Sequence, residues 1–415
     1  MEESPGFLHA FGICRTCLTM SGLWSDTHFK KSKKFVISVL YAANVFVILT
    51  FMNVAQTVKL FLIWGDFDEM SQIISTSDFS VGMLVVKMFV FRSYRKALAL
   101  LIEFVEKDWL DLKTISEEET MEQNAHTANK IYLTCFFLGN SAVNSYTLLR
   151  LGQEMSFLPG PPDKRQPLFD AYFPYDDKRS PAYEITWLMQ YAGIALANLA
   201  FTGMYCLFVG LMLHLCGQFA NLRIKLIEAV SRKEGESEKK SDGAKTFRER
   251  LAFIVERHNS LNKYAQVIEK IYHWIFFVEI LSSTIQMCSQ WFMLVTVISN
   301  TQGGLPYLQI GFLLIFTAHS GFHLFACCYA AERLQNESLS IFEAAYSCEW
   351  YNLSPQDAKM LLFIMQRTKT PLRVTAGKLC VFGLELFAKI LKTAGGYLSI
   401  LLAMRDRLVI DEEPI

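Results

Sequence analysis

Three ionisable side chains fall inside the last strongly apolar stretch of this chain, residues 379–404. If this stretch is a helix, steps of three and four residues place the charged and small residues on one face: Glu385, Lys389, Lys392, Gly396, Ser399 and Ala403. Large apolar residues such as Phe387, Ile390 and Leu398 occupy the opposite face. Each charge would cost roughly 2.5–3.5 kcal/mol against lipid at the membrane centre. The polar face must therefore contact protein or water.

Two arrangements satisfy this polar face. In the first, Glu385 and Lys389 form an ion pair that is buried between helices of one subunit. In the second, several copies of the helix surround an aqueous pore, and Ile400, Ala403 and Met404 form a narrow apolar ring that gates by dewetting. The physical chemistry of the residues leaves both arrangements open.

The remaining reactive side chains give weaker signals. Cys14 and Cys17 have the spacing of a redox or zinc motif, but no second pair accompanies them. His319 and His323 are four residues apart and could share a metal, yet no nearby carboxylate completes a site. We therefore expect no metal, no cofactor and no enzymatic activity. The two imidazoles are interpreted as packing or pocket-lining groups.

Seven apolar stretches organise the chain: residues 35–64, 72–91, 131–150, 185–219, 271–298, 305–331 and 379–404. A hydrocarbon core about 30 Å thick requires ~20 apolar helical residues to cross it. Asp78 and Lys87 interrupt the second stretch, and we expect them to face the bundle interior or water. With 52% hydrophobic residues and zero formal net charge, the chain gives no reason to expect a nucleic-acid partner. The sequence predicts an all-α integral membrane protein with seven transmembrane helices in contact with membrane lipids.

The connecting segments are basic on alternate sides of this bundle. Of the 40 Lys and Arg residues, 29 lie in the N-terminal segment and in every second connection, whereas six lie in the others. Short positively charged segments stay in the cytoplasm. We therefore expect a multi-pass protein of the cell membrane with its N-terminus inside and its C-terminus outside. This orientation disfavours a metabotropic seven-helix receptor, which remains an alternative.

The orientation also divides the chain into regions. We expect a cytoplasmic N-terminal segment (1–34), a bundle of six helices with the ligand pocket (35–330), cytoplasmic anchor helices (331–378), a last membrane helix (379–404) and an extracellular tail (405–415). The outer connection 151–184 is rich in Pro and Gly and predicts an ordered cap, and the low-complexity connection 231–245 predicts a flexible cytoplasmic loop. The segment 92–130 reads as a charged amphipathic helix that is interrupted near Glu117.

One pattern near the C-terminus resembles a known signature. It runs through Glu332, Glu337, Ser338, Ala344, Ala345, Tyr346, Trp350, Tyr351, Met365, Arg367, Pro371, Ala376, Gly377, Phe382, Phe387, Lys392 and Tyr397. This pattern is similar to the C-terminal signature of insect odorant receptors. The length of the chain, the seven predicted spans and the inverted orientation agree with that family.

The resemblance implies a tetrameric, odorant-gated and non-selective cation channel whose last helices line a central pore for permeating cations. It places the hydrophobic gate at Ile400, with Ala403 and Met404 beside it. The connection between the fourth and fifth spans is short, and a tail follows the last helix. Both features resemble an odour-tuning subunit that forms a heterotetramer with the odorant receptor co-receptor. A gustatory-type ligand-gated channel is a further alternative, but the Gln-Phe signature of its last span is missing.

The ligand implied by the family is a small volatile organic odorant, bound in the outer half of the bundle among the second to sixth helices. The helix ends in this region offer Phe79, Met83, Ser141, Asn144, Ser145, Met189, Gln190, Ile194, Met287, Ile310, Leu314 and Thr317. Asn144 could hydrogen-bond an ester, a ketone or a hydroxyl group. An apolar cavity with few polar groups is the expected kind of site.

Overall fold

The computed structural model describes residues 5–25, 29–65, 69–70, 73, 78–111, 113–155, 165–231, 246–299 and 306–412, with side chains described except at 78, 153–155 and 404–412. The low-complexity connection 232–245, residues 156–164 of the outer connection and the end of the tail (413–415) lie outside the described residues. The side chains of Asp78 and Met404 lie outside them as well.

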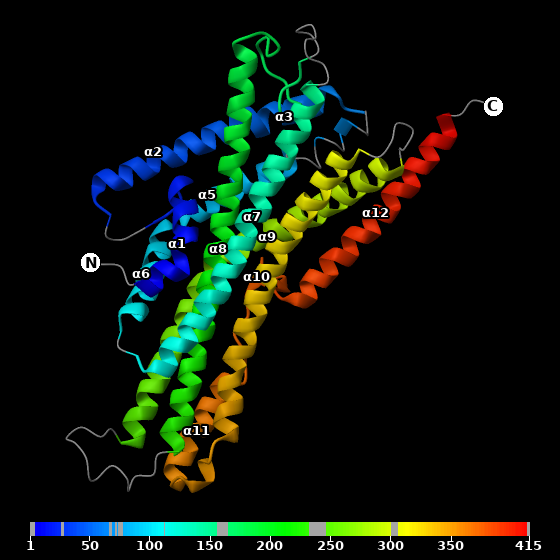
Figure 1. Ribbon diagram of the computed structural model, residues 1–415. Coiled ribbons are helices and arrows are strands. Elements are labelled where there is room, and N and C mark those ends of the chain that lie inside the picture. Colours follow the sequence, from blue (N-terminus) through cyan, green and yellow to red (C-terminus); the bar gives the residue numbers. More distant parts are fainter. Residues whose placement is uncertain are drawn as a thin grey trace.

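Four long helices run side by side along the molecule (Figure 1). They are α7 (Ile115–Met155), α8 (Ala182–Ser231), α9 (Phe247–Ser299) and α10 (Tyr307–Ser347). Helix α8 is central, because α1, α7, α9 and α10 all contact it. Every residue from 202 to 222 is buried. A helix that is apolar on all sides is expected to lie inside a bundle, as α8 does.

Shorter helices complete the part nearest the N-terminus. Helix α1 (Pro5–Met20) packs on α7 and α8, where Cys14 and Cys17 are buried. Helix α2 (Lys31–Val47), the π-helical η1 (Ile48–Val54) and α3 (Ala55–Leu62) form one continuous rod that crosses the bundle obliquely (Figure 1). Helices α5 (Asp78–Ser93) and α6 (Arg95–Leu110) follow. The first helix therefore contributes to the core.

Five helical segments of the described chain are long and apolar enough to cross a membrane: Lys31–Leu62, Ala182–Ser231, Phe247–Ser299, Tyr307–Ser347 and Leu384–Ala403. Of the other two predicted stretches, 131–150 falls within α7, and residues 78–91 of the stretch 72–91 fall within α5. Large apolar side chains are exposed on the outer surface, among them Phe46, Phe61 and Phe137. Such exposure is normal against lipid and rare against water.

The far end of the bundle is built from the lower halves of α8, α9 and α10 together with η3 (Trp350–Asn352) and α11 (Pro355–Thr368) (Figure 1). Side-chain caps begin the helices here. The Thr246 and Glu249 side chains accept hydrogen bonds from each other's backbone amides, and the Ser354 hydroxyl accepts one from the Asp357 amide. The segments on both sides of 231–245 belong to the continuous helices α8 and α9.

The interruption after α6 differs from its predicted place. The chain leaves the helix at Asp111 and enters α7 at Ile115, whereas Glu117 lies in the first turn of α7. The Thr114 amide donates to Glu117 Oε2 at 2.9 Å, and the Glu117 amide donates to the Thr114 hydroxyl at 3.3 Å. This capping box explains the difference, because a glutamate at the third helical position begins a helix.

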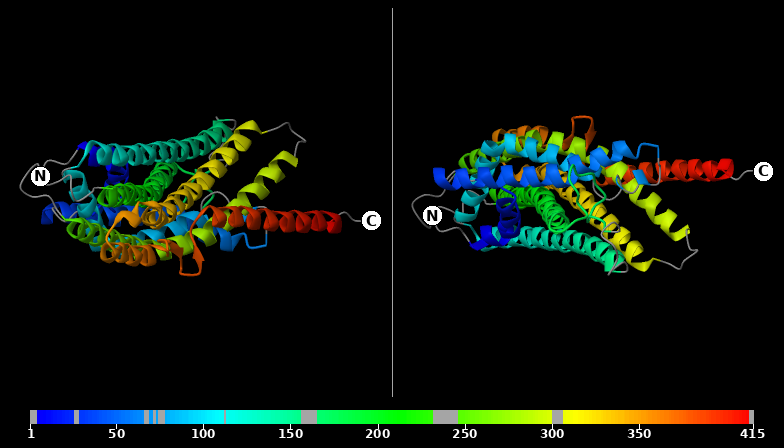
Figure 2. Two further views of the ribbon diagram at one scale, coloured as in Figure 1. Left: turned by 90° about the horizontal axis from the view of Figure 1, so that it is seen from below. Right: turned by 90° about the horizontal axis from the view of Figure 1, so that it is seen from above.

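The last helix, α12 (Leu384–Glu412), starts later than the predicted residue 379. Strands β1 (Thr375–Ala376) and β2 (Cys380–Val381) form an antiparallel hairpin immediately before it. Gly377 and Lys378 turn the chain with φ angles of 57° and 61°, which a right-handed helix cannot contain. Figure 2 shows that α12 extends beyond the rest of the bundle in views from both ends.

Candidate functional site

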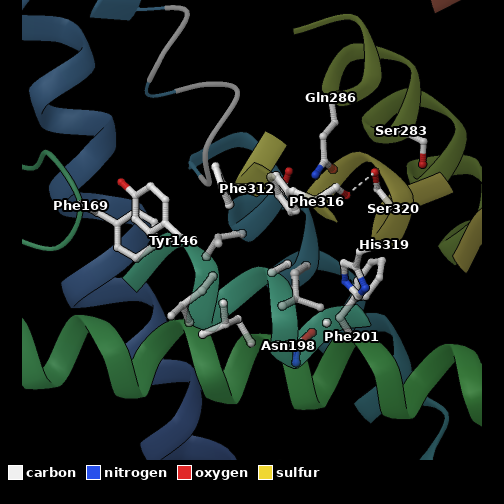
Figure 3. A pocket seen from close by; sticks show the side chains of 18 of the residues that line it. Tyr146, Phe169, Asn198, Phe201, Ser283, Gln286, Phe312, Phe316, His319 and Ser320 are labelled. Carbon is white, nitrogen blue, oxygen red and sulfur yellow. Dashed lines mark hydrogen bonds between the residues drawn. The ribbon is translucent and has the colours of Figure 1, made fainter. Parts of the chain in front are cut away.

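A cavity of about 100 Å³ lies between α5, α7, α8, α9 and α10 (Figure 3). The connection between α7 and α8 closes it at one end with Phe169. We call this the loop end, and the opposite end, near Phe201 and His319, the deep end. An engineered apolar cavity of roughly 150 Å³ binds benzene, so a space of this order suits a molecule with a single ring.

Aromatic side chains form the loop end of the cavity. The ring of Tyr146 stacks on Phe169 with 4.7 Å between centroids and lies 5.0 Å from the ring of Phe312. Phe312 stacks in turn on Phe316 at 5.5 Å. Rings at these separations make favourable offset contacts and present flat apolar walls.

The connection that carries Phe169 is held by side chains of the bundle. Gln190 of α8 accepts a hydrogen bond from the Phe169 amide and donates one to its carbonyl oxygen, both at 3.1 Å. Arg150 donates to the Pro167 carbonyl at 2.9 Å and pairs with Asp170 at 3.1 Å. The described residues 165–181 thus form an ordered, non-helical cap, which agrees with the Pro-rich sequence.

Polar groups gather at the deep end. The amide of Asn198 on α8 and the imidazole of His319 on α10 both line the cavity, and Figure 3 shows them close together. His319 is 7% exposed, and its Nδ1 atom has no hydrogen-bond partner among the described residues. Opposite them, Gly139 of α7 lacks a side chain. A Cβ atom at Gly139 would lie 2.9 Å from His319 Cε1 and closer still to Asn198 Oδ1.

A buried ion pair adjoins the deep end. Lys87 Nζ of α5 lies 2.6 Å from Glu279 Oε2 of α9, and both side chains are almost fully buried. Tyr205 also donates to Glu279 Oε2, and the Ser283 hydroxyl donates to Oε1 at 2.7 Å. Glu279 and Ser283 belong to the cavity wall. The position of Lys87 agrees with the expectation that it faces the bundle interior.

The structure brings few of the sequence-predicted ligand residues to this cavity. Ile194 lines it, and Gln190 acts from behind by holding Phe169. Ser141 and Asn144 are exposed on α7, and Leu314 is exposed on α10. The others lie elsewhere on the same helices and are buried or half-buried: Phe79, Met83, Ser145, Met189, Met287, Ile310 and Thr317. The cavity described here therefore has a different lining.

Sequence reasoning missed most of that lining. On α7 the cavity is lined by Gly139, Ala142, Val143 and Tyr146, a face adjacent to the predicted one. One signal was present: Lys87 and Glu279 are isolated charges of opposite sign within apolar stretches, which predicts that they pair. His319, which the sequence predicts to be a packing or pocket-lining residue, lines the cavity.

The polar face of α12 is a second candidate site. Glu385, Lys389, Lys392, Gly396, Ser399, Ile400 and Ala403 are all exposed, whereas Ile390 and Ala394 on the other face are buried. Lys389 Nζ and Glu385 Oε1 form an ion pair at 2.6 Å, but their side chains are 68% and 84% exposed. The ion pair of the first arrangement therefore forms without being buried inside this chain.

The start of α12 is fixed by residues from α9 and α10. Gly377 of the hairpin donates its amide proton to the His273 carbonyl at 2.8 Å, and the ring of Phe382 stacks on Phe276 at 4.1 Å. Glu332 Oε2 accepts from the Leu384 amide at 2.8 Å, which caps the helix with a negative charge. The C-terminal signature residues therefore attach α12 to the bundle.

Comparisons with known proteins agree on one family. A family model described as 7tm Odorant receptor matches residues 66–395. Odorant receptor 10 of Aedes albopictus is 24% identical over 348 residues, which cover 81% of this chain and 85% of that protein. Odorant receptor 22c of Drosophila melanogaster is 23% identical over 326 residues, covering 77% and 78%. The odorant receptor coreceptor of Aedes aegypti is 27% identical over 158 residues, 38% of this chain and 32% of that protein.

The fold is shared with a solved olfactory receptor. The structure of the insect olfactory receptor OR5 from Machilis hrabei in complex with eugenol matches with a TM-score of 0.80 at 14% identity, covering 96% of this chain and 99% of that one. At this identity the likeness concerns the fold. Because the family model spans most of the 415 residues, this chain, a multi-pass membrane protein, belongs to the insect odorant receptor family.

Proposed function

We propose that this chain is the odour-tuning subunit of an odorant-gated, non-selective cation channel, which it forms with the odorant receptor coreceptor. The observation that carries the proposal is the exposed polar face of α12, a helix apolar enough to cross a membrane. Three charged residues on that face cannot contact lipid without a large cost. Water shared by several subunits satisfies them.

The tuning role is supported by the pattern of relatives. Odorant receptors of two insects align with about four fifths of this chain, whereas the coreceptor of Aedes aegypti aligns with 38% of it. A subunit that differs from the coreceptor over most of its length is suited to provide the variable ligand pocket. We assign that pocket to the cavity between Phe169 and His319.

We further propose seven membrane spans, with the N-terminus in the cytoplasm and the C-terminus outside. In this proposal α5 and α7 complete the five more apolar segments. The burial of Lys87 against Glu279 removes the main obstacle to placing α5 in the membrane. The distribution of 29 against six basic residues supports the orientation.

Heterologous expression tests the proposal. The chain is expressed with and without an insect coreceptor, and membrane currents are recorded during exposure to a panel of volatile compounds. We expect odorant-evoked cation currents that require this chain for their ligand selectivity. Epitope tags at the two ends are read in intact cells, and only the C-terminal tag should be accessible. Responses identical to those of the coreceptor alone would refute the tuning role.

A further inference from the structure

The two ends of the proposed ligand cavity differ in chemistry, which restricts the ligand. The loop end offers the faces of Tyr146, Phe169 and Phe312, and the deep end offers Asn198 and His319. A molecule that satisfies both ends has a flat apolar body and one polar group. With a cavity of about 100 Å³, the body is a single ring or a chain of similar size.

The deep end contains a polar atom that the protein leaves without a partner. His319 is nine-tenths buried, lines the cavity, and has an Nδ1 atom that accepts or donates no hydrogen bond within the described chain. Burying a polar group without a hydrogen-bond partner is unfavourable. A ligand that supplies the missing hydrogen bond recovers this cost, whereas a hydrocarbon does not.

The absence of a side chain at Gly139 lets Asn198 and His319 pack closely against α7 at the deep end of the cavity. The position that a Cβ atom would take at Gly139 is 2.9 Å from His319 Cε1 and closer to Asn198 Oδ1. The amide oxygen of Asn198 and the edge of the imidazole thus converge on the same space. We call Gly139, Asn198 and His319 the polar subsite.

The groups of the polar subsite can both accept and donate hydrogen bonds, and the nearby carboxylate of Glu279 is already largely satisfied. The carboxylate of Glu279 has three bound donors, from Lys87, Tyr205 and Ser283, and a carboxylate has about four acceptor positions. The Asn198 carbonyl oxygen adds an acceptor, and a neutral imidazole keeps one acceptor nitrogen. The negative charge of Glu279 also disfavours a carboxylate ligand.

We infer that the preferred odorant is a small aromatic alcohol or phenol, bound with its ring at the loop end and its hydroxyl group in the polar subsite. The inference rests on the proposed function, because it takes the cavity to be the odorant site. The hydroxyl donates to Asn198 Oδ1 or to the unprotonated imidazole nitrogen and accepts from the Asn198 amide. An ether can only accept, and a hydrocarbon does neither.

Three probes with equal numbers of non-hydrogen atoms test the inference: benzyl alcohol, anisole and ethylbenzene. Concentration–response curves are recorded from cells that express the full chain with a coreceptor. We expect benzyl alcohol to act at a concentration about tenfold lower than anisole or ethylbenzene. Asn198→Leu and His319→Phe should each remove this preference while the response to ethylbenzene persists. Gly139→Ala should weaken benzyl alcohol most, because its Cβ would clash with Asn198 Oδ1 and displace the polar groups of the subsite.

Thr134→Val is the matched control, since Thr134 is exposed on α7 and its hydroxyl bonds to the Lys130 carbonyl of its own helix. It should keep the wild-type order of the probes. Equal potency of the three probes on the wild-type channel would overturn the inference and leave the channel function intact. An alcohol preference that survives both Asn198→Leu and His319→Phe would also overturn it. Silence towards every volatile in a broad panel would instead refute the proposed function.

Discussion

The buried pair of Lys87 and Glu279 shows how single residues shape this receptor. Two charges in the middle of a bundle are tolerated because they lie 2.6 Å apart and because Tyr205 and Ser283 add hydrogen bonds to the carboxylate. Such a pair adds little net stability compared with apolar residues of the same volume. Its effect is specific: it fixes α5 against α9 beside the cavity.

We predict that Lys87→Met alone destabilises the protein by about 3–5 kcal/mol, because it leaves Glu279 as an uncompensated buried charge. The amount of folded protein at the cell surface and its thermal unfolding temperature in detergent should both fall. The double variant Lys87→Met with Glu279→Gln should recover most of the loss, since the uncharged amide can accept from one of the Tyr205 and Ser283 hydroxyls and donate to the other. A double variant as unstable as the single one would contradict this account.

His258 provides a pH-dependent contribution in the lower half of α9, outside the predicted span 271–298. Burial, followed by the positive charge of Arg367, lowers the pKa of His258 from its ordinary value of 6.5 to about 4. The folded protein thus binds a proton at His258 less readily than the unfolded chain. Stability from this residue is complete above pH 6.5 and is lost as the pH falls from 6.5 towards 4.

Thermal unfolding of the purified protein should show this dependence. We expect the unfolding temperature of the wild type to fall more steeply between about pH 6.5 and 4.5 than that of His258→Gln, which cannot be protonated. His126→Gln on α7 is the control. This substitution changes neither the burial of His258 nor the charge of Arg367, which together set the pKa of His258. Parallel curves for wild type and His258→Gln would show that His258 does not contribute.

At the scale of helices, the sequence predicts which face is exposed where that face carries charged residues, as on α12. It does not predict the orientation of a helix such as α7, whose span carries few charges. The charged residues of α12 lie on its exposed face, and Ile390 is buried on the other side as expected, together with Ala394. On α7, the sequence places polar residues in the pocket, but Asn144 and Ser145 donate to carbonyl groups of their own helix, at Asn140 and Ala142. Because lipid and protein core are both apolar, periodicity alone does not fix the rotation of such a helix.

The hairpin before α12 was also beyond sequence reasoning. Each strand has two residues, which is too short for an alternating pattern. The hairpin is held by distant partners, including the carbonyl of His273 and the ring of Phe276. The signature residues Ala376, Gly377 and Phe382 were visible in the sequence, but their shared role of docking this hairpin on α9 appears only in three dimensions.

The cap on α12 gives an element-scale prediction. Glu332 of α10 accepts the Leu384 amide proton at 2.8 Å, and losing such a cap costs about 1 kcal/mol. Glu332→Ala should loosen the attachment of α12 while the bundle stays folded. We expect normal surface expression and a roughly fivefold shift in the odorant concentration for half-maximal current.

Glu343→Ala provides the comparison, because Glu343 is an exposed glutamate on the same helix. It should leave the concentration–response curve unchanged. Glu332→Gln retains an acceptor oxygen without the charge and should give an intermediate shift. Wild-type gating in Glu332→Ala would mean that the cap does not couple α10 to the movement of α12.

Across the whole molecule, a continuous set of contacts joins the two candidate sites. Helices α9 and α10 contribute Glu279, Ser283 and His319 to the cavity, and the same helices hold the start of α12 through Phe276 and Glu332. A ligand that shifts α9 relative to α10 therefore acts on the base of the proposed pore helix. This gives odorant binding a physical route to the gate, if binding favours one arrangement of these helices.

The proposed gate gives the prediction that depends on the assembled channel. Ile400 is 56% exposed in the single chain. In the closed pore it would contact the residues at the corresponding position of the neighbouring subunits. Each buried methylene contributes ~0.8 kcal/mol, and Ile→Ala removes three carbon groups, so their loss from the closed state favours opening by more than about tenfold. Ile400→Ala in channels formed with the coreceptor should raise the current recorded without odorant.

Introduced cysteines should distinguish the two faces of α12, with Ser399→Cys open to a charged thiol reagent and Ala394→Cys protected. Unchanged basal and evoked currents in Ile400→Ala, together with equal labelling of both cysteines, would mean that water does not reach this face of α12.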